Sequence, residues 1–196
     1  MTFLKKSNLG INMYKIVLCG DGAVGKTSLR LKYMGRGFQA KYMMTIGADF
    51  SLKEILVADS SGITRTYKFQ LWTLAGQQNF SSVRPLYFMD AHGAILVYDI
   101  TRLSTFENIN SWIKEIVKGI GKKTFALMII ANKIDLREQS DITISTEEGC
   151  EFVKQISDET FGGQISIPYI ETSAKTGENV DKAFQKMAEL INKTYP

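Results

Sequence analysis

The sequence predicts an α/β fold: a six-stranded, mostly parallel, doubly wound sheet with helices on both faces and one antiparallel hairpin strand. Three observations lead to this prediction. Continuous apolar runs alternate with segments of helical periodicity, a glycine-rich turn joins the first apolar run to a helix, and two extended segments flank a polar turn. The 196 residues, 44% hydrophobic and 22% charged, fit one globular domain.

Four apolar, β-branched runs predict the central strands, because the strands of a parallel sheet are covered on both faces. These runs are YKIVLCG (14–20), GAILVYDI (93–100), FALMIIA (125–131) and ISIPYIE (165–171). Residues 48–57 and 64–73 flank a turn containing DSSG, so we expect them to form a β-hairpin.

Helix starts are predicted where side chains satisfy free backbone N–H groups. Ser104-x-x-Glu107 and Ser145-x-x-Glu148 both match the capping-box pattern. A final helix is expected to pack one face on the sheet, because apolar residues recur there at helical spacing: Val180, Phe184, Met187 and Ile191.

Composition narrows the functional class. The net charge of +4 is spread along the chain, which argues against a nucleic-acid-binding protein. Cys19 and Cys150 lie in apolar contexts and are expected to be buried thiols in a reducing compartment. No secretory signal is visible, and no apolar run approaches the roughly 20 residues that a membrane span requires, so a cytoplasmic location is expected.

The first predicted strand runs into GDGAVGKTS (20–28), which fills every position of the phosphate-loop pattern G-x-x-x-x-G-K-[ST]. Its glycines let successive N–H groups face a polyphosphate, and the following helix brings its positive dipole end to the same place. Lys26 is expected to reach the terminal phosphates and the Thr27 hydroxyl to bind Mg²⁺. The nucleotide-binding residues expected here are Gly22, Ala23, Val24, Gly25, Lys26, Thr27 and Ser28.

Two later segments, IIANKIDL (129–136) and ETSAK (171–175), select the base, because ligands of such folds bind beyond the carboxyl ends of the strands. The Asp135 carboxylate can accept hydrogen bonds from guanine N1–H and the exocyclic amine, a donor pair that adenine lacks. Asn132 is expected either to bind the base edge or to tie neighbouring loops together. The residues expected to bind the base are Asn132, Lys133, Asp135, Ser173, Ala174 and Lys175, with the Lys133 stem over the ring and the Ala174 N–H at the guanine oxygen.

With these motifs in this order, residues 14–193 resemble the Ras superfamily of small GTPases, most closely its Rab-like branch. TIGADF (45–50) is similar to the Rab-type first switch. The resemblance implies a P-loop NTPase fold and a monomeric GTP/GDP switch that hydrolyses GTP with Mg²⁺. It also implies an effector, an exchange factor and an activating protein as partners. The first 13 residues and the last three (194–196) are expected to lie outside this domain.

The resemblance assigns roles in the first switch. It implies that Phe38 packs against the edge of guanine and that Tyr42 closes over the phosphates. Thr45 is implied to bind Mg²⁺ together with Thr27 and to sense the γ-phosphate through its backbone N–H. The first switch contains no arginine to act in cis, so an activating protein that supplies one is expected.

The second switch, within FQLWTLAGQQNF (69–80), is implied to sense the γ-phosphate at Gly76 and to orient the attacking water with Gln77, which with Lys26 forms the catalytic pair. One family residue is missing: Thr73 stands where an aspartate is usual, and Leu74 where a threonine is usual. Residues 60–89 contain neither Asp nor Glu, so no other register of this segment supplies a carboxylate.

The missing carboxylate would help hold Mg²⁺ in the family template. Loss of one charge-assisted contact costs about 1.5–3 kcal/mol, or roughly 10–100-fold in affinity. The Thr73 hydroxyl can keep a water in place but cannot neutralise the ion, so slow hydrolysis is expected. The alternative is a guanine-nucleotide-binding scaffold with little or no hydrolysis. An ATP-dependent P-loop kinase is disfavoured by the N-K-x-D motif.

The sequence ends in INKTYP and does not begin Met-Gly, so no lipid anchor is expected and a membrane role would need a partner protein. His92 is expected to be structural. The hairpin turn (58–63) and SDETFGGQ (157–164) are expected to be surface loops.

Overall fold

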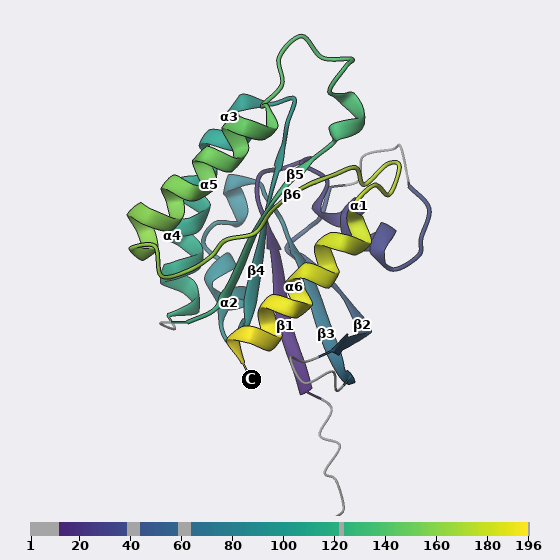
Figure 1. Ribbon diagram of the computed structural model, residues 1–196, viewed down its shortest axis with the longest axis vertical. Helices are drawn as coiled ribbons and strands as arrows, with labels where there is room; N and C mark the ends of the chain where they lie inside the picture. Colours follow the sequence, from purple (N-terminus) through teal and green to yellow (C-terminus); the bar gives the residue numbers. More distant parts are fainter. Residues whose placement is uncertain (1–11, 39–43, 59–63, 122–123, 196) are drawn as a thin grey trace, which may run out of the picture.

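The computed structural model describes residues 12–38, 44–58, 64–121 and 124–195 (Figure 1). The strands are β1 (Asn12–Cys19), β2 (Ala48–Ala58), β3 (Thr64–Leu74), β4 (Gly93–Asp99), β5 (Ala126–Asn132) and β6 (Tyr169–Thr172). The helices are α1 (Lys26–Tyr33), α2 (Arg84–Phe88), α3 (Leu103–Glu107), α4 (Ile109–Ile120), α5 (Thr146–Phe161) and α6 (Val180–Thr194). Two 3-10 turns are η1 (Gln78–Phe80) and η2 (Ile134–Leu136).

The strands form one sheet in the order β2-β3-β1-β4-β5-β6, in which only β2 and β3 run antiparallel. This confirms the predicted fold class. The predicted strand at 165–171 was too long at its start, since β6 begins at Tyr169. Pro168 precedes it, and a proline has no N–H to donate to the strand ladder.

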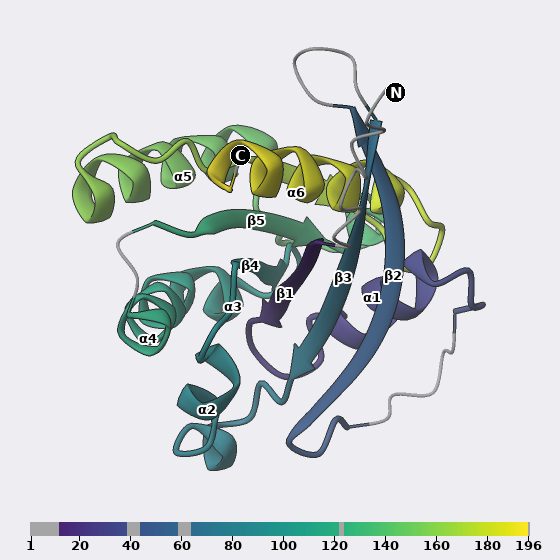
Figure 2. The same cartoon turned by 90° about the horizontal axis from the view of Figure 1, so that it is seen from below.

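Two apolar layers cover the sheet (Figure 2). Helices α1 and α6 pack on one face and α2, α4 and α5 on the other. Every residue of β4 and β5 is buried, as the continuous apolar runs predicted. The expected core face of α6 is also confirmed, because its four predicted residues are all buried.

One of the two predicted capping boxes is present. The Ser145 hydroxyl accepts from the Glu148 N–H at 3.1 Å, and the Glu148 carboxylate accepts from the Ser145 N–H at 2.8 Å. The prediction at Ser104 was wrong, because α3 begins at Leu103 and its N-cap is Arg102, two residues before Ser104. The Thr105 hydroxyl donates to the Arg102 carbonyl at 2.8 Å and accepts from the Asp99 N–H, which fixes this turn against the end of β4.

Helix α5 corrects two further expectations. It extends to Phe161, so most of the expected 157–164 loop is helical, and Gly162 ends the helix with a φ of 59°. Cys150 is exposed on α5, next to the exposed Glu151, and not buried, whereas Cys19 is buried as predicted. Residues 59–63 of the expected hairpin turn lie outside the described residues.

His92 has the structural role that was expected. Its Nδ1 accepts a hydrogen bond from the Lys15 N–H at 3.1 Å, and its ring packs edge-on against Tyr14 and Tyr195 at the end of the sheet away from the phosphate loop. Within the described part of the chain, no helix has both the length and the apolar composition needed to cross a membrane.

Candidate nucleotide-binding site

A cavity of about 470 Å³ opens beyond the carboxyl ends of β1, β3 and β5. It collects residues from the phosphate loop, both switches and both base motifs. The predicted residues that line it are Gly22, Ala23, Gly25, Lys26, Thr27, Ser28, Phe38, Thr45, Gly76, Gln77, Asn132, Lys133, Asp135, Ala174 and Lys175. The volume lies within the usual range for small-molecule sites.

Two predicted residues do not line the cavity, and a third lies outside the described residues. Val24 is buried in the core beneath α6, Ser173 is buried behind Asp135, and Tyr42 lies outside the described residues. Sequence reasoning missed four lining residues, namely Leu31, Gly37, Leu74 and Leu136. Each lies within three residues of a predicted site residue, and no pattern in the residue types distinguishes them from core leucines or loop glycines.

The phosphate loop holds a buried ammonium. Lys26 opens α1, and its Nζ donates to the carbonyls of Gly20 and Asp21 at 2.6 and 2.7 Å. Burial lowers the pKa of Lys26 to about 8. An anion in the cavity would favour the charged ammonium, so the loop is suited to phosphate.

The phosphate loop is also bound to helix α4 through Asp21, a position that the phosphate-loop pattern leaves open. The Asp21 carboxylate accepts from Trp112 Nε1 at 2.8 Å and from Asn108 Nδ2 at 2.7 Å. Both oxygens of the carboxylate therefore have partners, and the start of the loop is bound to a rigid helix.

Asn132 ties the loops together, which was one of its two predicted roles. Its amide donates to the Val24 carbonyl at 2.8 Å, and its oxygen accepts from the Thr172 hydroxyl and the Ala174 N–H, both at 3.1 Å. Gly25, with a φ of 102°, leaves room for this amide, because a Cβ there would overlap Asn132 Nδ2. The buried asparagine thus joins the phosphate loop to the second base motif.

Asp135 lines the cavity, and each of its carboxylate oxygens has a neighbour in the second base motif. Oδ1 accepts from the Ser173 hydroxyl at 2.6 Å, while Oδ2 lies 3.8 Å from Lys175 Nζ. Lys133 adopts a left-handed conformation with a φ of 73°, and its ammonium pairs with Asp99 at 2.6 Å. The Asp135 carboxylate is thus oriented by Ser173, a residue that the sequence also placed in the nucleotide site.

The two predicted metal ligands meet at the cavity wall. The hydroxyl oxygens of Thr27 and Thr45 are 2.9 Å apart. Two adjacent ligands of an octahedral Mg²⁺ with oxygens at about 2.05 Å also lie about 2.9 Å apart. The pair fits Mg²⁺ as two neighbouring ligands, although the described residues contain no cluster of three or more His, Cys, Asp or Glu side chains that could hold a metal.

Thr73 is fully buried near the end of β3, and its hydroxyl donates to the Asp49 carbonyl at 3.1 Å. Asp49 lies directly opposite it in the β2–β3 ladder. The carboxylate of Asp49 is already bound to Arg30 on α1. The nearest acid across the sheet therefore has its own cation, and the Thr73 proton is committed to a backbone carbonyl.

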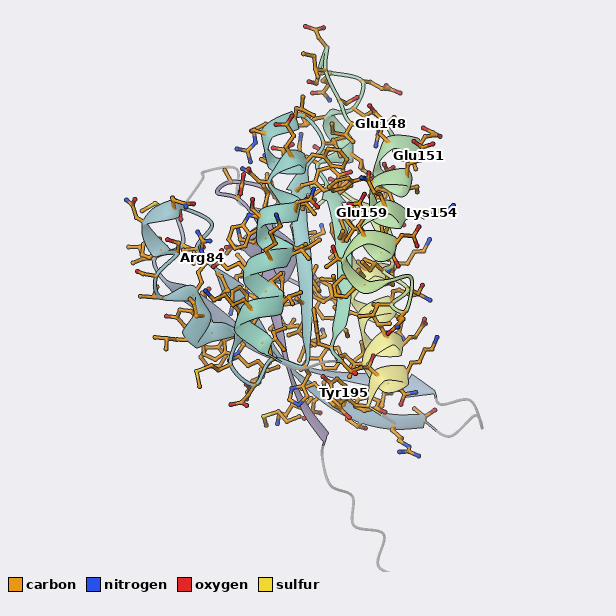
Figure 3. All side chains as sticks on the ribbon, turned by 90° about the vertical axis from the view of Figure 1, so that its left-hand side faces the viewer. Arg84, Glu148, Glu151, Lys154, Glu159 and Tyr195 are labelled. Carbon is orange, nitrogen blue, oxygen red and sulfur yellow. The ribbon has the colours of Figure 1, made fainter. Side chains whose placement is uncertain are left out.

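The second switch lies directly on the phosphate loop. A Cβ on Gly76 would collide with backbone atoms of residues 20–22, so only glycine fits there. The Gln77 carbonyl accepts from Arg84 Nη2 at 2.8 Å. Arg84, which sequence reasoning missed, is buried, pairs with Glu115 at 2.7 Å and stacks 4.2 Å from the Trp112 ring (Figure 3). It anchors the backbone of the switch to α4.

Comparisons with known proteins agree with this geometry. A family model described as the Ras family matches residues 15–193. Ras-related protein RIC1 of Oryza sativa subsp. japonica is 37% identical over 179 residues, covering 91% of this chain and 80% of the relative. Ras-related protein Rab7 of Drosophila melanogaster is 35% identical over 181 residues, covering 91% and 80%. Ras-related protein Rab-5B of Plasmodium falciparum is 36% identical over 187 residues, covering 95% and 82%. The chain therefore belongs to the Ras family of small GTPases and is a nucleotide-dependent switch that hydrolyses GTP.

Proposed function

We propose that residues 14–193 act as one GTPase domain that binds GTP and GDP in the cavity and hydrolyses GTP slowly. One observation carries this proposal: a single cavity gathers the Lys26 ammonium, the paired Thr27 and Thr45 hydroxyls and the oriented Asp135 carboxylate. These groups match the terminal phosphates, the metal and the base of one nucleotide.

Guanine is selected by Asp135. Ser173 fixes one carboxylate oxygen, which orients the group so that it can accept hydrogen bonds from N1–H and the exocyclic amine of guanine. Adenine offers no such donor pair and would leave the carboxylate without partners, which costs several kcal/mol. Phe38 and the stem of Lys133 line the same part of the cavity and would pack against the base.

The phosphates bind to the loop N–H groups of residues 22–28 and to Lys26. The Thr27 and Thr45 hydroxyls would hold Mg²⁺, which supplies positive charge to the phosphate oxygens. In hydrolysis a water attacks the γ-phosphorus and the bond to the β–γ bridging oxygen breaks, giving GDP and phosphate. Gln77 orients that water, and Lys26 stabilises the charge that develops on the phosphate oxygens.

Thr73 lowers the turnover without removing the binding site. Its hydroxyl is bonded to the Asp49 carbonyl, and an oxygen without charge cannot replace a metal-ordering carboxylate. The expected loss is about 10–100-fold in Mg²⁺ affinity, since one charge-assisted contact is missing. Leu74 adds an apolar wall at the same place.

Switching follows from contacts that depend on the γ-phosphate. Thr45 and Gly76 would bind it in the GTP state and release it after hydrolysis. Beside both switches lies an aromatic surface made of Phe50, Trp72 and Tyr87, in which the Phe50 and Trp72 rings stack 4.9 Å apart and Phe50 is 52% exposed. Exposed apolar surface of this kind suits an effector. An exchange factor and an arginine-supplying activating protein complete the expected set of partners.

Single-turnover phosphate release tests the proposal. The protein is loaded with one equivalent of GTP, saturating Mg²⁺ is added, and phosphate and nucleotide are followed over hours. We expect phosphate to appear slowly up to one equivalent while GDP stays bound, and Gln77→Ala to slow the release further. GTP that stays bound and uncleaved for hours would instead identify a scaffold, and failure to retain GTP would refute the site itself.

A further inference from the structure

One peptide of the phosphate loop is held by a side chain from a distant part of the sequence. Arg102 follows β4 and donates from Nη2 to the Gly22 carbonyl at 2.9 Å. Its Nε donates to Asp99 Oδ2 at 3.0 Å, so the guanidinium bridges a carboxylate and the loop. Neither the phosphate-loop pattern nor the base motifs includes Arg102.

The anchor of this bridge is rigid. Asp99 is 1% exposed at the end of β4, and its Oδ1 accepts from the N–H and the hydroxyl of Thr101 at 3.0 and 2.8 Å. Its Oδ2 serves both Arg102 and the Lys133 ammonium. Burial alone would raise the pKa of Asp99, but the hydrogen bonds from Lys133 and Thr101 lower it below its ordinary value, so the carboxylate is ionised at neutral pH.

The hydrogen bond has a geometric consequence at Ala23. The Gly22 carbonyl and the Ala23 N–H belong to the same planar, trans amide and point in opposite directions. The carbonyl points to Arg102, which is not among the described residues that line the cavity, while Ala23 does line it. The Ala23 N–H is therefore turned away from Arg102 and toward the cavity.

The hydrogen bond from Arg102 also stabilises an unfavourable backbone conformation at Ala23. Ala23 has a φ of 64°, a left-handed conformation that is unfavourable for a residue with a Cβ. A hydrogen bond from a charged donor fixes the amide plane, and it polarises the N–H on the other side of the amide. Both effects favour a phosphate oxygen at that N–H.

We propose that Arg102 is a positioning residue that holds the Gly22–Ala23 amide with its N–H toward the nucleotide phosphates, and that Asp99, shared with Lys133, couples this amide to the base motif. The inference rests on the proposed nucleotide site. Arg102 touches neither the base nor the reacting atoms in this arrangement, so it acts on phosphate binding through the backbone.

The experiment measures the dissociation of a fluorescent GDP from the wild-type protein, Arg102→Met, Arg102→Lys and the control Arg137→Met. Arg137 is matched to Arg102, because its side chain is 31% exposed against 39% and it pairs with one carboxylate, that of Glu171. Its guanidinium donates to the Ile144 carbonyl and the Glu171 carboxylate, not to the phosphate loop. Both methionine variants remove one positive charge.

We expect Arg102→Met to release GDP about 10–100-fold faster, the effect of losing one charge-assisted hydrogen bond. Arg102→Lys should release it nearly as fast, since a lysine keeps the charge but not the planar fork that reaches two acceptors. Arg137→Met should stay within about twofold of wild type. In ¹⁵N-resolved NMR of the GDP complex, the Ala23 amide proton should move upfield in Arg102→Met but not in Arg137→Met.

Equal dissociation from Arg102→Met and Arg137→Met would overturn the proposal. So would full rescue by Arg102→Lys, which would show an effect of charge alone. If Arg102→Met does not fold, Arg102→Lys decides: faster release at unchanged net charge supports the proposal, and an unchanged rate refutes it. A wild-type protein that retains no GDP would instead refute the nucleotide site.

Discussion

The two ends of the cavity differ in how completely they hold the side chains that the family pattern requires. At the base end, Asn132 makes three hydrogen bonds between loops, and Asp135 is oriented by Ser173. At the γ-phosphate end, the glycine and glutamine of the second switch are in place, but Thr73 is buried with its hydroxyl on a backbone carbonyl. The described structure places no carboxylate of β3 or the second switch at that end.

In the proposed mechanism, this difference means that recognition and turnover depend on separate groups. The base end is completed by side chains of β5, β6 and their following loops, whereas the hydrolytic end depends on β3 and the segment after it. A substitution in β3 can therefore slow the chemistry while the nucleotide remains selected and held. Substitutions at one end at a time separate the two roles.

The largest effect is expected at the base end. Asp135→Asn removes the charge that accepts two guanine N–H groups and should lower GTP affinity on the order of 10²–10⁴-fold. Xanthosine triphosphate should recover part of that loss, because its C2 oxygen can accept from the new amide. Competition titration with the two nucleotides checks this. Unchanged GTP affinity would show that Asp135 does not read the base.

The next largest effect is expected at the γ-phosphate end, where hydrolysis takes place. Gln77→Ala should slow single-turnover hydrolysis on the order of 10²-fold, because the attacking water loses its orienting group. GTP affinity should change far less than it does in Asp135→Asn. Parallel rate and binding measurements test the separation of the two ends. An affinity loss as large as the rate loss would contradict it.

A smaller effect concerns Lys26, which lies between the two ends. Burial lowers its folded-state pKa to about 8 from an ordinary 10.5, so between these values the unfolded chain binds more protons than the nucleotide-free folded protein. Lys26 should therefore make the free energy of unfolding rise with pH above about 8, and this contribution is the difference from Lys26→Met, because the buried Cys19 thiol, whose pKa burial raises, has the opposite slope in both proteins.

The measurement is chemical denaturation of the nucleotide-free protein between about pH 7.5 and 9.5, below the range where tyrosines titrate. The rise should be absent in Lys26→Met. Identical pH slopes in the two proteins would mean that Lys26 does not cause the rise.

The smallest effect serves as a control for both ends. Ser145→Ala removes the N-cap of α5, a residue that is not among the described residues lining the cavity, and should destabilise the protein by about 1 kcal/mol. Nucleotide affinity and hydrolysis should stay at wild-type values. A change in either would show that α5 is coupled to the site.

Much of this arrangement follows from local patterns. The phosphate loop, the continuous apolar strands and the helical spacing in α6 each depend on residues close in sequence, and the structure has them near the predicted positions, except that β6 begins only at Tyr169. The two errors at helices had local causes as well. Thr105 shifted the start of α3 away from Ser104, and α5 continued through residues that resemble a loop in composition.

What sequence could not provide depends on contacts between distant segments. Arg84 and Arg102 belong to no motif, and only the fold brings them to Gln77 and Gly22. The role of Asn132 also stayed open, because a single asparagine can serve base or backbone. Asp49 came to lie opposite Thr73 through the register of the hairpin, which composition does not specify.

Magnesium binding tests the central claim, that Thr73 weakens the metal site and leaves nucleotide binding intact. Mg²⁺ is titrated calorimetrically into the complex with a non-hydrolysable GTP analogue, for wild type, Thr73→Asp and Thr73→Val. Thr73→Asp should bind Mg²⁺ about 10–100-fold more tightly. Thr73→Val should match wild type, because the wild-type hydroxyl is committed to the Asp49 carbonyl. Equal Mg²⁺ affinity in wild type and Thr73→Asp would contradict the claim.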